Sequence, residues 1–373
     1  MRIIHISDLH IGKRLHEVSL LEDQVYILKQ IEDILEKKQA DALFIAGDIY
    51  DKTVPSAEAV RVFDEFLVGV TKLDIPIFMI SGNHDSAERL GFGGRILSNA
   101  SVYVSPVYNG SIESVSVQDM YGELSIYLLP FIKPSHVRAY HSDAEIESYT
   151  DTVRVALEDV ALDACKRNII LSHQFVTGAL TSDSEELLVG GSENVDVSVY
   201  DGFDYVALGH IHRAQHCVHE TVRYSGTPLK YSFSEHNHTK SVTIVDLLEK
   251  GSVHISTVPL VPRRDVKILT GTYLDLMGHR DMDESYLRIV LTDEEEQLDA
   301  LSKLRSVYPN IMELRYDNTR TRTVDAVIGA IEVKNKSPFE LFAELFERQH
   351  GQVLSEEEER VLLETLSQVG EDR

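Results

Sequence analysis

The sequence is short of the features that mark secreted and membrane proteins. It has two cysteines, Cys165 and Cys217, and no tryptophan. Two cysteines are too few for a disulfide framework or a four-thiolate metal site, so we expect a reducing, cytoplasmic setting. The apolar stretch at residues 3–6 is too short for a signal-peptide core, and no apolar run approaches the roughly 20 residues that a membrane helix needs.

Positive charge is also scarce. The chain has 36 Lys and Arg residues against 61 Asp and Glu residues, which gives a formal net charge of -25. Affinity for a nucleic-acid backbone comes mainly from Lys and Arg side chains that neutralise phosphates. The composition therefore argues against a broad basic surface, and a nucleic-acid function would need local basic patches, metal ions or a partner.

What the sequence does contain is material for a substantial core. At 373 residues and 43% hydrophobic composition, the chain is predicted to form two globular domains and a tail. Short apolar runs alternate with stretches of helical spacing, which indicates an α/β fold. The runs expected as buried strands are 2–7, 42–46, 77–81, 125–129, 168–172 and 205–208, and the expected helices span 25–35, 60–70 and 151–164.

The later part of the chain changes pattern. Strands are expected at 222–225, 242–247 and 254–259, so the first domain is predicted to be a sheet sandwich flanked by helices. The segment "VPLVPRRDV" sets a boundary near residue 263. A strand at 286–291 and a helix over 293–307 then predict a small α/β capping domain over 264–335, followed by a helical tail over 336–373.

The capping domain and the tail carry two candidate interaction surfaces. One is a local basic set in the capping domain, for which a solvated surface is the alternative interpretation. The other is the aromatic helical tail, where a capping box predicts the start of a second helix. We expect this tail to dock on a partner, and packing on the chain's own domain is the alternative interpretation. The basic set is Lys303, Arg305, Arg315, Arg320 and Arg322, and the tail residues are Phe339, Leu341, Phe342, Leu345, Phe346 and Ser355–Glu358.

Five loops are candidates for a functional site. Each contains carboxylate, imidazole or amide side chains and directly follows the end of a predicted strand. They read Asp8-Leu-His10, Gly47-Asp48-Ile-Tyr-Asp51, Gly82-Asn83-His84-Asp85, His173 and Gly209-His210-Ile-His212. Open α/β sheets gather ligand sites at the carboxyl ends of their strands. Each pattern alone is typical of an ordinary turn or polar loop, but five in this position predict one shared site.

The residue types in these loops favour metal binding. Carboxylates, imidazoles and an amide oxygen suit metals of intermediate hardness. A pair of metals about 3.5 to 4 Å apart needs a bridging ligand, for which the centrally placed Asp48 is suited. The glycines at 47, 82 and 209 are expected to allow tight turns near the ions. His5, inside the first strand, is expected to belong to the core.

These motifs resemble those of the calcineurin-like metallophosphoesterase superfamily: D-x-H, GD-x-x-D, GNH-[DE], H and GH-x-H occur here in that order. More narrowly, "SGTPLKYSFSE", "PRRDV" and "ELFAELFERQHG" are similar to the bacterial nuclease subunits that are related to double-strand-break repair nucleases. This resemblance implies two divalent cations, Mn²⁺ in family members. One would be held by Asp8, His10, Asp48 and His212, and the other by Asp48, Asn83, His173 and His210.

The same resemblance implies roles for the remaining motif residues. His84 would face the scissile phosphate as general acid or charge stabiliser, with Asp85 orienting its ring. Asp51 stands where archaeal and eukaryotic relatives often have histidine, which leaves its role open between support of a ligand and none in catalysis.

The function that the resemblance implies is hydrolysis of DNA phosphodiesters in replication, recombination and repair. The expected activities are a double-strand exonuclease and an endonuclease on single strands and hairpins. Expected partners are DNA ends, a second copy of the chain and an ATPase subunit on which the tail docks, within a heterotetramer. The motifs alone indicate only a phosphoester, so a phosphatase or small-molecule phosphodiesterase and a non-catalytic DNA-end-binding scaffold remain alternatives.

Overall fold

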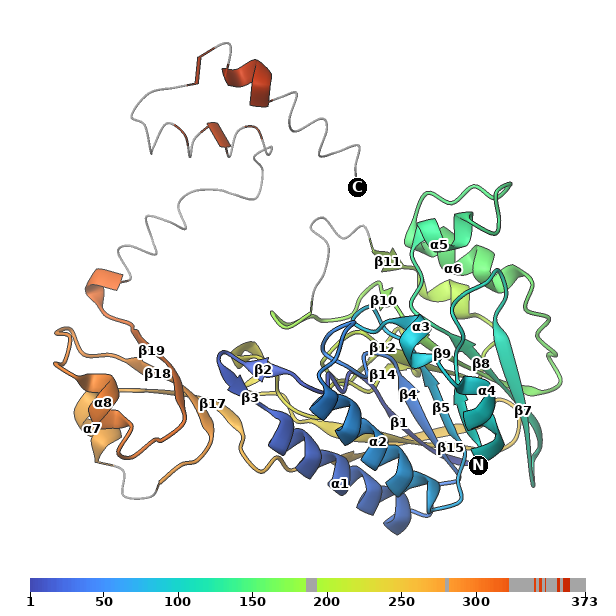
Figure 1. The fold of residues 1–373 in the computed structure, drawn as a ribbon, viewed down its shortest axis with the longest axis horizontal. Helices are drawn as coiled ribbons and strands as arrows, with labels where there is room; N and C mark the ends of the chain where they lie inside the picture. The colour runs from blue at the N-terminus through green and yellow to red at the C-terminus, as the bar shows by residue number, and fades with distance from the viewer. Residues whose placement is uncertain are drawn as a thin grey trace. The chain divides into compact units, whose positions relative to one another are not determined.

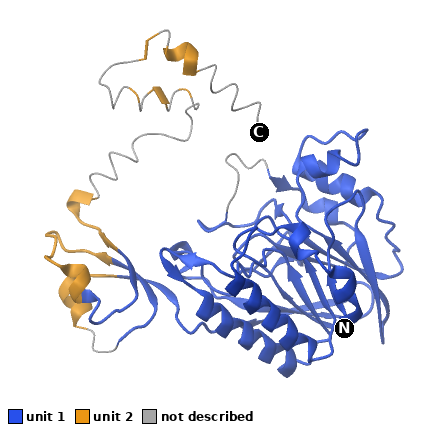
Figure 2. Ribbon diagram, in the orientation of Figure 1, with its two compact units in different colours: residues 1–269, 280–289, 304–313 blue, residues 270–279, 290–303, 314–373 orange. Residues whose placement is uncertain are grey.

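A computed structural model describes residues 1–185, 193–278, 282–321, 339, 342–343, 346, 354–355 and 358–362. The chain divides into two compact units (Figure 2). The larger unit comprises residues 1–269, 280–289 and 304–313, and the smaller unit comprises 270–279, 290–303 and 314–373. The boundary at residue 263 stays a prediction. No helix among the described residues is long and apolar enough to span a membrane.

Two six-stranded sheets form the centre of the larger unit (Figure 1). The first sheet has the order β16-β15-β1-β4-β5-β6, and the second has the order β13-β14-β12-β9-β8-β7. The strands of the first sheet are Val253–Pro259, Ser241–Leu247, Arg2–Ile6, Ala42–Ala46, Ile77–Ile80 and Val102–Val104. Those of the second are Gln215–Cys217, His219–Tyr224, Tyr205–Gly209, Arg167–His173, Gly122–Leu129 and Glu113–Asp119.

Alternate residues of each strand enter different cores, because side chains alternate across a strand. Ile3 of β1 packs with Phe44 and with Leu171 and Ala207 of the other sheet, so the two sheets face each other across a shared core. Ile4 points the opposite way, into the core under the helices. His5 is fully buried and lies 2.9 Å from the hydroxyl of Tyr205, which confirms its expected place in the core.

Helices cover the outer faces of both sheets. The apolar sides of α1 (Leu21–Lys37) and α2 (Ala57–Thr71) pack on the first sheet, and α5 (Pro134–Arg138) and α6 (Tyr149–Glu158) pack on the second. The predicted sandwich flanked by helices is therefore confirmed. Shorter elements lie in the connections: β2 Arg14–Leu15, β3 Val18–Ser19, α3 Ala87–Leu90, α4 Gly94–Leu97, β10 Phe175–Val176 and β11 Asn194–Val195.

The predicted helix over 151–164 was wrong at both ends. Ser148 caps α6 in a capping box with Asp151, so the helix begins earlier, at Tyr149. It ends at Glu158, and the carboxylate of Asp163 accepts a hydrogen bond from the amide of Cys165 instead. A short polar side chain that bonds the nearby main chain competes with helix formation.

A three-stranded sheet, β17 (Val266–Gly271), β18 (Tyr286–Leu291) and β19 (Ile311–Tyr316), follows, with helices α7 (Tyr273–Met277) and α8 (Ala300–Leu304). The helix predicted over 293–307 was too long, since α8 starts only at Ala300. Asp299 has a φ of 55°, which an α-helix does not allow, and the Asp293 carboxylate accepts a hydrogen bond from the amide of Tyr273.

The predicted tail lies mostly outside the described residues, as does Arg322. Within the described part, the predicted capping box is present: Ser355 Oγ accepts a hydrogen bond from the amide of Glu358, and the Glu358 carboxylate accepts one from the amide of Ser355. Residues 358–362 are helical.

Candidate metal centre

The five predicted loops meet at one place in the larger unit. Three leave the carboxyl ends of β1, β4 and β5 in the first sheet, which run parallel. Two leave β9 and β12 in the second sheet, which are also parallel. Because the two sheets face each other, loops from both converge at one edge of the sandwich.

Four of the predicted ligands have strained backbone. Asp8, His10, Asp48 and His210 have φ values of 52°, 43°, 49° and 103°. Such conformations are uncommon for residues with a side chain, and they cluster at functional sites. Positive φ at four of the seven predicted ligands is therefore a backbone feature expected of a functional site at this edge.

The motif glycines act mostly through their lack of a side chain. A Cβ added to Gly82 would lie 2.1 Å from Oδ1 of Asp48, and one added to Gly209 would lie 1.8 Å from the carbonyl oxygen of Ala46. Of the three, Gly47 has a positive φ, 86°. The expectation that all three serve as tight turns thus holds for Gly47. Gly82 lets its loop approach the Asp48 loop of the same sheet, and Gly209 lets the end of β12 approach the end of β4 in the other sheet.

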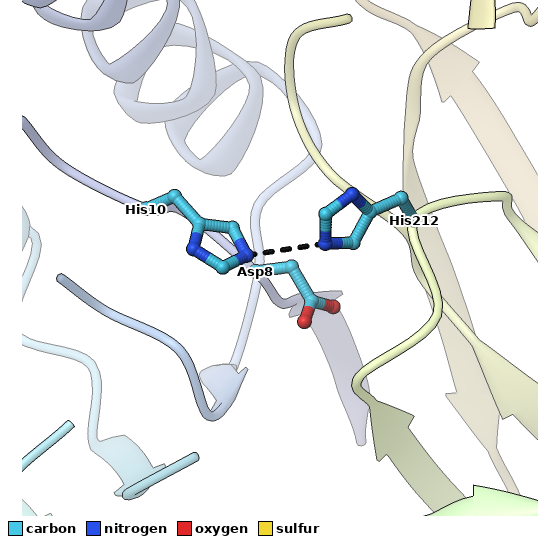
Figure 3. Close-up of side chains that lie close together, drawn as sticks. All are labelled: Asp8, His10 and His212. Atoms are coloured by element: carbon cyan, nitrogen blue, oxygen red, sulfur yellow. Dashed lines mark hydrogen bonds between the residues drawn. The ribbon is translucent and has the colours of Figure 1, made fainter. Parts of the chain in front are cut away.

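Asp8, His10 and His212 form one cluster of donor atoms within 4.8 Å of one another (Figure 3). The Nε2 atoms of His10 and His212 lie 3.1 Å apart. Asp8 Oδ1 accepts a hydrogen bond from the amide of His210, whereas Oδ2 is buried and has no hydrogen-bond partner among the described residues. A buried carboxylate oxygen without a partner is costly, and a cation at this point would satisfy it.

Asn83, His173 and His210 form a second cluster. Oδ1 of Asn83 lies 3.1 Å from Nε2 of His173 and 2.9 Å from Nδ1 of His210. Oδ2 of Asp48 lies between the clusters, 3.4 Å from Nε2 of His173 and 3.6 Å from Nε2 of His10. Asp48 therefore occupies the position that a bridging ligand would need.

The electrostatics of the site favour positive charge. Burial lowers the pKa of His173, but the carboxylate of Asp48 outweighs burial and raises that pKa to about 9. Burial raises the pKa of Asp8 to about 6, against the effect of nearby histidines. The buried carboxylates thus favour a nearby positive charge. In the metal-free protein, a proton on His173 supplies part of this positive charge. The residues fit divalent metal ions, which displace such protons when they bind.

A buried network that was not predicted from the sequence supports His212. Its Nδ1 lies 2.8 Å from the hydroxyl of Ser184, which donates to Oε1 of Glu235 at 2.6 Å. Glu235 in turn pairs with buried Lys240, whose ammonium also donates to the carbonyl of His212. Since the serine proton points to Glu235, Nδ1–H of His212 donates to Ser184 and Nε2 stays free to bind a metal. The "SGTPLKYSFSE" stretch, which contains Glu235, was the available signal.

A second unpredicted support holds the D-x-H loop. The side-chain amide of Gln24, on α1, donates to the carbonyls of Leu9 (3.2 Å) and His10 (2.7 Å) and accepts from the amide of Gly12 (2.9 Å). A glutamine on a helix gives no indication in the sequence that it holds a neighbouring loop.

The expected role of Asp85 was wrong. Its carboxylate accepts hydrogen bonds from the amides of Ile49, Tyr50 and Gly82, so it joins the Asp48 loop to the Asn83 loop. Nδ1 of His84 instead donates to the carbonyl oxygen of Asp51 at 3.1 Å. The family resemblance implied a contact between Asp85 and His84, but the Asp85 carboxylate is occupied by the three amides and the His84 ring is held by the main chain of Asp51.

Asp51 has two contacts at this site. Its main chain orients His84, and its side chain pairs with Lys13 at 2.8 Å and lies 3.8 Å from Nδ1 of His10. His84 also belongs to a candidate donor group with His10 and Asp48. The roles of the predicted ligands and of His84 therefore remain predictions.

Comparison with known proteins agrees with these motifs. Calcineurin-like phosphoesterases match residues 1–214, and a family described as "Type 5 capsule protein repressor C-terminal domain" (SbcD_C) matches residues 262–350. The D subunit of the nuclease SbcCD from Staphylococcus epidermidis is 37% identical over 321 residues, which cover 84% of this chain and 85% of that protein. The chain belongs to the SbcD family of calcineurin-like phosphoesterases.

Two solved structures are also similar to this SbcD family member. A dimetal phosphatase from Danio rerio is 12% identical, covers 70% of this chain and 99% of its own, and has a TM-score of 0.40. The protein TT1561 of Thermus thermophilus is 13% identical, with coverages of 69% and 98% and a TM-score of 0.38.

Proposed function

We propose that the chain is a metal-dependent DNA nuclease subunit that acts in the cytoplasm with an SbcC ATPase partner. The observation that carries this proposal is the convergence of seven donor residues from five loops around Asp48. One ion would be held by Asp8, His10, Asp48 and His212, and the other by Asp48, Asn83, His173 and His210. Mn²⁺ suits this mixture of oxygen and imidazole donors.

Two such cations would supply activation of a water molecule and neutralisation of phosphodiester charge. The chain's own contribution is to fix their ligands. Nδ1 of His173 donates to the carbonyl of Ala46 at 2.8 Å, which directs Nε2 towards Asp48. His212 is fixed in the same way through Ser184. Rigid ligands let the site stabilise developing charge without reorganising.

His84 would transfer a proton. Because its Nδ1 donates to the Asp51 carbonyl, its Nε2 is the atom available to the substrate. The side chain is only partly buried, and its ring centroid lies 4.8 Å from that of His10, at the rim of the cluster. A protonated Nε2 in this place can donate to the leaving oxygen of a cleaved phosphodiester.

The proposed activities are exonuclease on double strands and endonuclease on single strands and hairpins. To test them, the Mn²⁺-loaded protein, with and without SbcC and ATP, is assayed on linear duplex, hairpin DNA and p-nitrophenyl phosphate. Cleavage of DNA is expected. Strong phosphatase activity without DNA cleavage would favour the small-molecule phosphoesterase, and DNA-end binding without any hydrolysis would favour the scaffold. An Asp48→Asn variant, which removes the bridging carboxylate, controls for contaminating nucleases.

The capping region would supply part of the DNA grip. Within the described part of the predicted basic set, Arg320 is 83% exposed and lies 3.5 Å from Glu296. So loose a surface pair leaves the guanidinium available to a phosphate. Arg320→Ala should weaken DNA binding most at low salt, because phosphate contacts release counterions.

A second copy of the chain would bind through α2 and the segment α3–α4. Phe92 is 85% exposed and Ile96 is 75% exposed, and a groove of about 330 Å³ beside them is lined by Val60, Leu90 and Leu97. Large exposed apolar side chains of this kind mark interaction surfaces. Sedimentation of the wild type should give a dimer, and a Phe92→Asp, Ile96→Asp double variant should give a monomer.

The tail would bind SbcC. The proposal rests on its aromatic content and on exposed Phe342 and Val361, which are 47% and 54% accessible. A protein ending near residue 335 should retain its metals but fail to co-purify with SbcC. If that truncated protein still bound SbcC, the tail would not be the docking element.

A further inference from the structure

A cavity of about 620 Å³ lies beside the metal centre and has no role in the function proposed above. Its lining includes Asn83, Tyr108, Phe131, Lys133, His136 and Tyr140, here called the Lys133 pocket. Asn83 is shared: its Oδ1 lies 2.9 Å from His210 and 3.1 Å from His173. A molecule whose phosphate reaches the metal centre can therefore place a neighbouring group in this pocket.

The pocket has aromatic walls at both ends. At the metal end, the ring of Phe131 lies nearly parallel to that of His210, with centroids 6.4 Å apart and an interplanar angle of 16°. At the far end, Tyr108 and Tyr140 meet edge to face at 6.0 Å, and Tyr140 is 56% exposed. Exposed aromatic rings next to a phosphate site are typical platforms for stacked nucleobases.

The pocket also holds a cation that has no carboxylate partner in the described part of the chain. Lys133 is exposed, forms no ion pair with any residue in the described ranges, and has its Nζ 5.9 Å from the centroid of Phe131. Nδ1 of His136 accepts from the amide of Lys133 at 3.4 Å, so Nε2 of His136 is left as a donor. The two acids of the lining are engaged, Asp85 by three main-chain amides and Glu88 by the hydroxyl of Ser86.

We propose that the Lys133 pocket binds the nucleotide adjoining the scissile phosphate, with its base on Tyr140 and its own phosphate at Lys133. The volume lies within the range of about 300–1,000 Å³ typical of small-molecule sites. The inference rests on the proposed function, because it assigns the flanking part of the same nucleic-acid substrate. It makes the pocket selective for a base-bearing phosphoester over a simple phosphate ester.

The test compares dAMP with deoxyribose 5-phosphate, which lacks the base, by calorimetric titration of the Mn²⁺-loaded protein. Stacking of one base is expected to make dAMP bind about tenfold more tightly. Tyr140→Ala should remove most of that difference, whereas Lys133→Ala should weaken both ligands alike. The matched controls are Tyr26→Ala and Lys72→Ala. Both residues are exposed and neither lines the pocket; Tyr26 lies on α1 and Lys72 directly follows α2.

Equal binding of the two ligands, or a preference for dAMP that survives Tyr140→Ala, would overturn the pocket assignment. Cleavage of DNA by the same preparations separates this outcome from the proposed function. If the wild-type protein cleaves DNA but binds dAMP no more tightly than deoxyribose 5-phosphate, only the pocket assignment is rejected. If the preference for dAMP is present in the wild type and lost in Tyr140→Ala, but the wild type does not cleave DNA, the nucleotide pocket stands and the nuclease function is rejected.

Discussion

The hydroxyl of Ser184 lies 2.8 Å from Nδ1 of His212 and donates its own hydrogen bond to Glu235. Supports of this kind fix the tautomer and direction of a metal-binding imidazole. Burial raises the pKa of Glu235, but Lys240 and the bond towards His212 outweigh it and hold that pKa below its usual range. The lowered pKa favours the carboxylate form of Glu235, which is the form that accepts the hydrogen bond from Ser184.

Ser184→Ala should weaken metal binding without unfolding the protein. Loss of such a support typically costs about 10–100-fold in affinity. Mn²⁺ titration followed by electron paramagnetic resonance should show one of two sites weakened. Ser256→Ala, an exposed serine on β16, is the matched control. If both sites kept wild-type affinity, Ser184 would have no part in positioning His212.

His84→Ser should retain both metals and lose cleavage. Loss of a general acid typically lowers the rate about 10²–10⁴-fold. Elemental analysis beside the cleavage assay separates the two possible roles of His84, since it lies in a donor group with His10 and Asp48. A drop in metal content would make His84 a ligand, and unchanged cleavage would remove it from the mechanism.

Metal binding should release protons at neutral pH. In the metal-free protein the pKa of His173 is raised to about 9, so its ring is protonated at pH 7 and must lose that proton to bind an ion. Calorimetry in buffers of different ionisation enthalpy should detect about one proton released for this site. Affinity should fall as the pH is lowered. A binding enthalpy that is independent of the buffer at pH 7 would contradict the assignment of His173.

Asp119 and Arg167 give a prediction for stability. Arg167 is fully buried at the start of β9 and donates to both oxygens of Asp119. Partial burial raises the pKa of Asp119, but these hydrogen bonds and the amino group of Met1 outweigh it and lower the pKa to about 2. Because the folded pKa lies below the ordinary value of 3.8, the stabilisation is complete above about pH 4. It is lost as the pH falls towards 2.

Asp119→Asn should therefore lower the free energy of unfolding by about 2 kcal/mol at pH 7, a typical value for hydrogen bonds to charged groups. Urea denaturation at pH 7 and at pH 3 should show the difference shrinking at the lower pH. Asp64→Asn, at an exposed position on α2, should change little at either pH. A difference that stays constant with pH would mean that the charge of Asp119 is not what stabilises the fold.

The parts of the fold that followed from sequence are those that a local pattern determines. Ala42–Ala46 is a strand over the predicted residues, because an apolar run of that length suits a strand covered on both faces. The meeting of five loops followed from one rule, that carboxyl ends of parallel strands share an edge. His10 and His212, 202 positions apart, were placed in one site in this way.

The parts that did not follow depend on single contacts between distant segments. Gln24 and Ser184 support the metal ligands, yet each is an ordinary polar residue whose purpose appears only once its partner is near. Glu235 lies in the family-like stretch "SGTPLKYSFSE", but that stretch does not reveal which side chain Glu235 contacts. The family resemblance implies that Asp85 orients the ring of His84, whereas its carboxylate accepts hydrogen bonds from three main-chain amides. Asp299 keeps the helix predicted over 293–307 from starting before Ala300 through its left-handed φ, which no periodicity reveals.

Gly209→Ala should test how tightly the two sheets close over the metal centre. The φ of Gly209 is not in the left-handed region, so the change adds no backbone strain, and its whole effect comes from a Cβ 1.8 Å from the carbonyl oxygen of Ala46. Overpacking typically costs about 1–3 kcal/mol, and we expect the upper end because the contact is with rigid main chain. The strand ends should separate, so that urea denaturation shows lower stability and elemental analysis shows lost metal.

Gly94→Ala is the matched control for this change. It adds the same methyl group at another ordinary φ, but the nearest atom, Cβ of Val104, is 3.9 Å away, an ordinary contact. In a helix that substitution should leave stability unchanged or raise it by about 0.5–1 kcal/mol. If Gly209→Ala behaved like Gly94→Ala and kept its metals, the strand ends would have room to separate. Close contact between the sheets would then not be what holds the ligands of both sheets together.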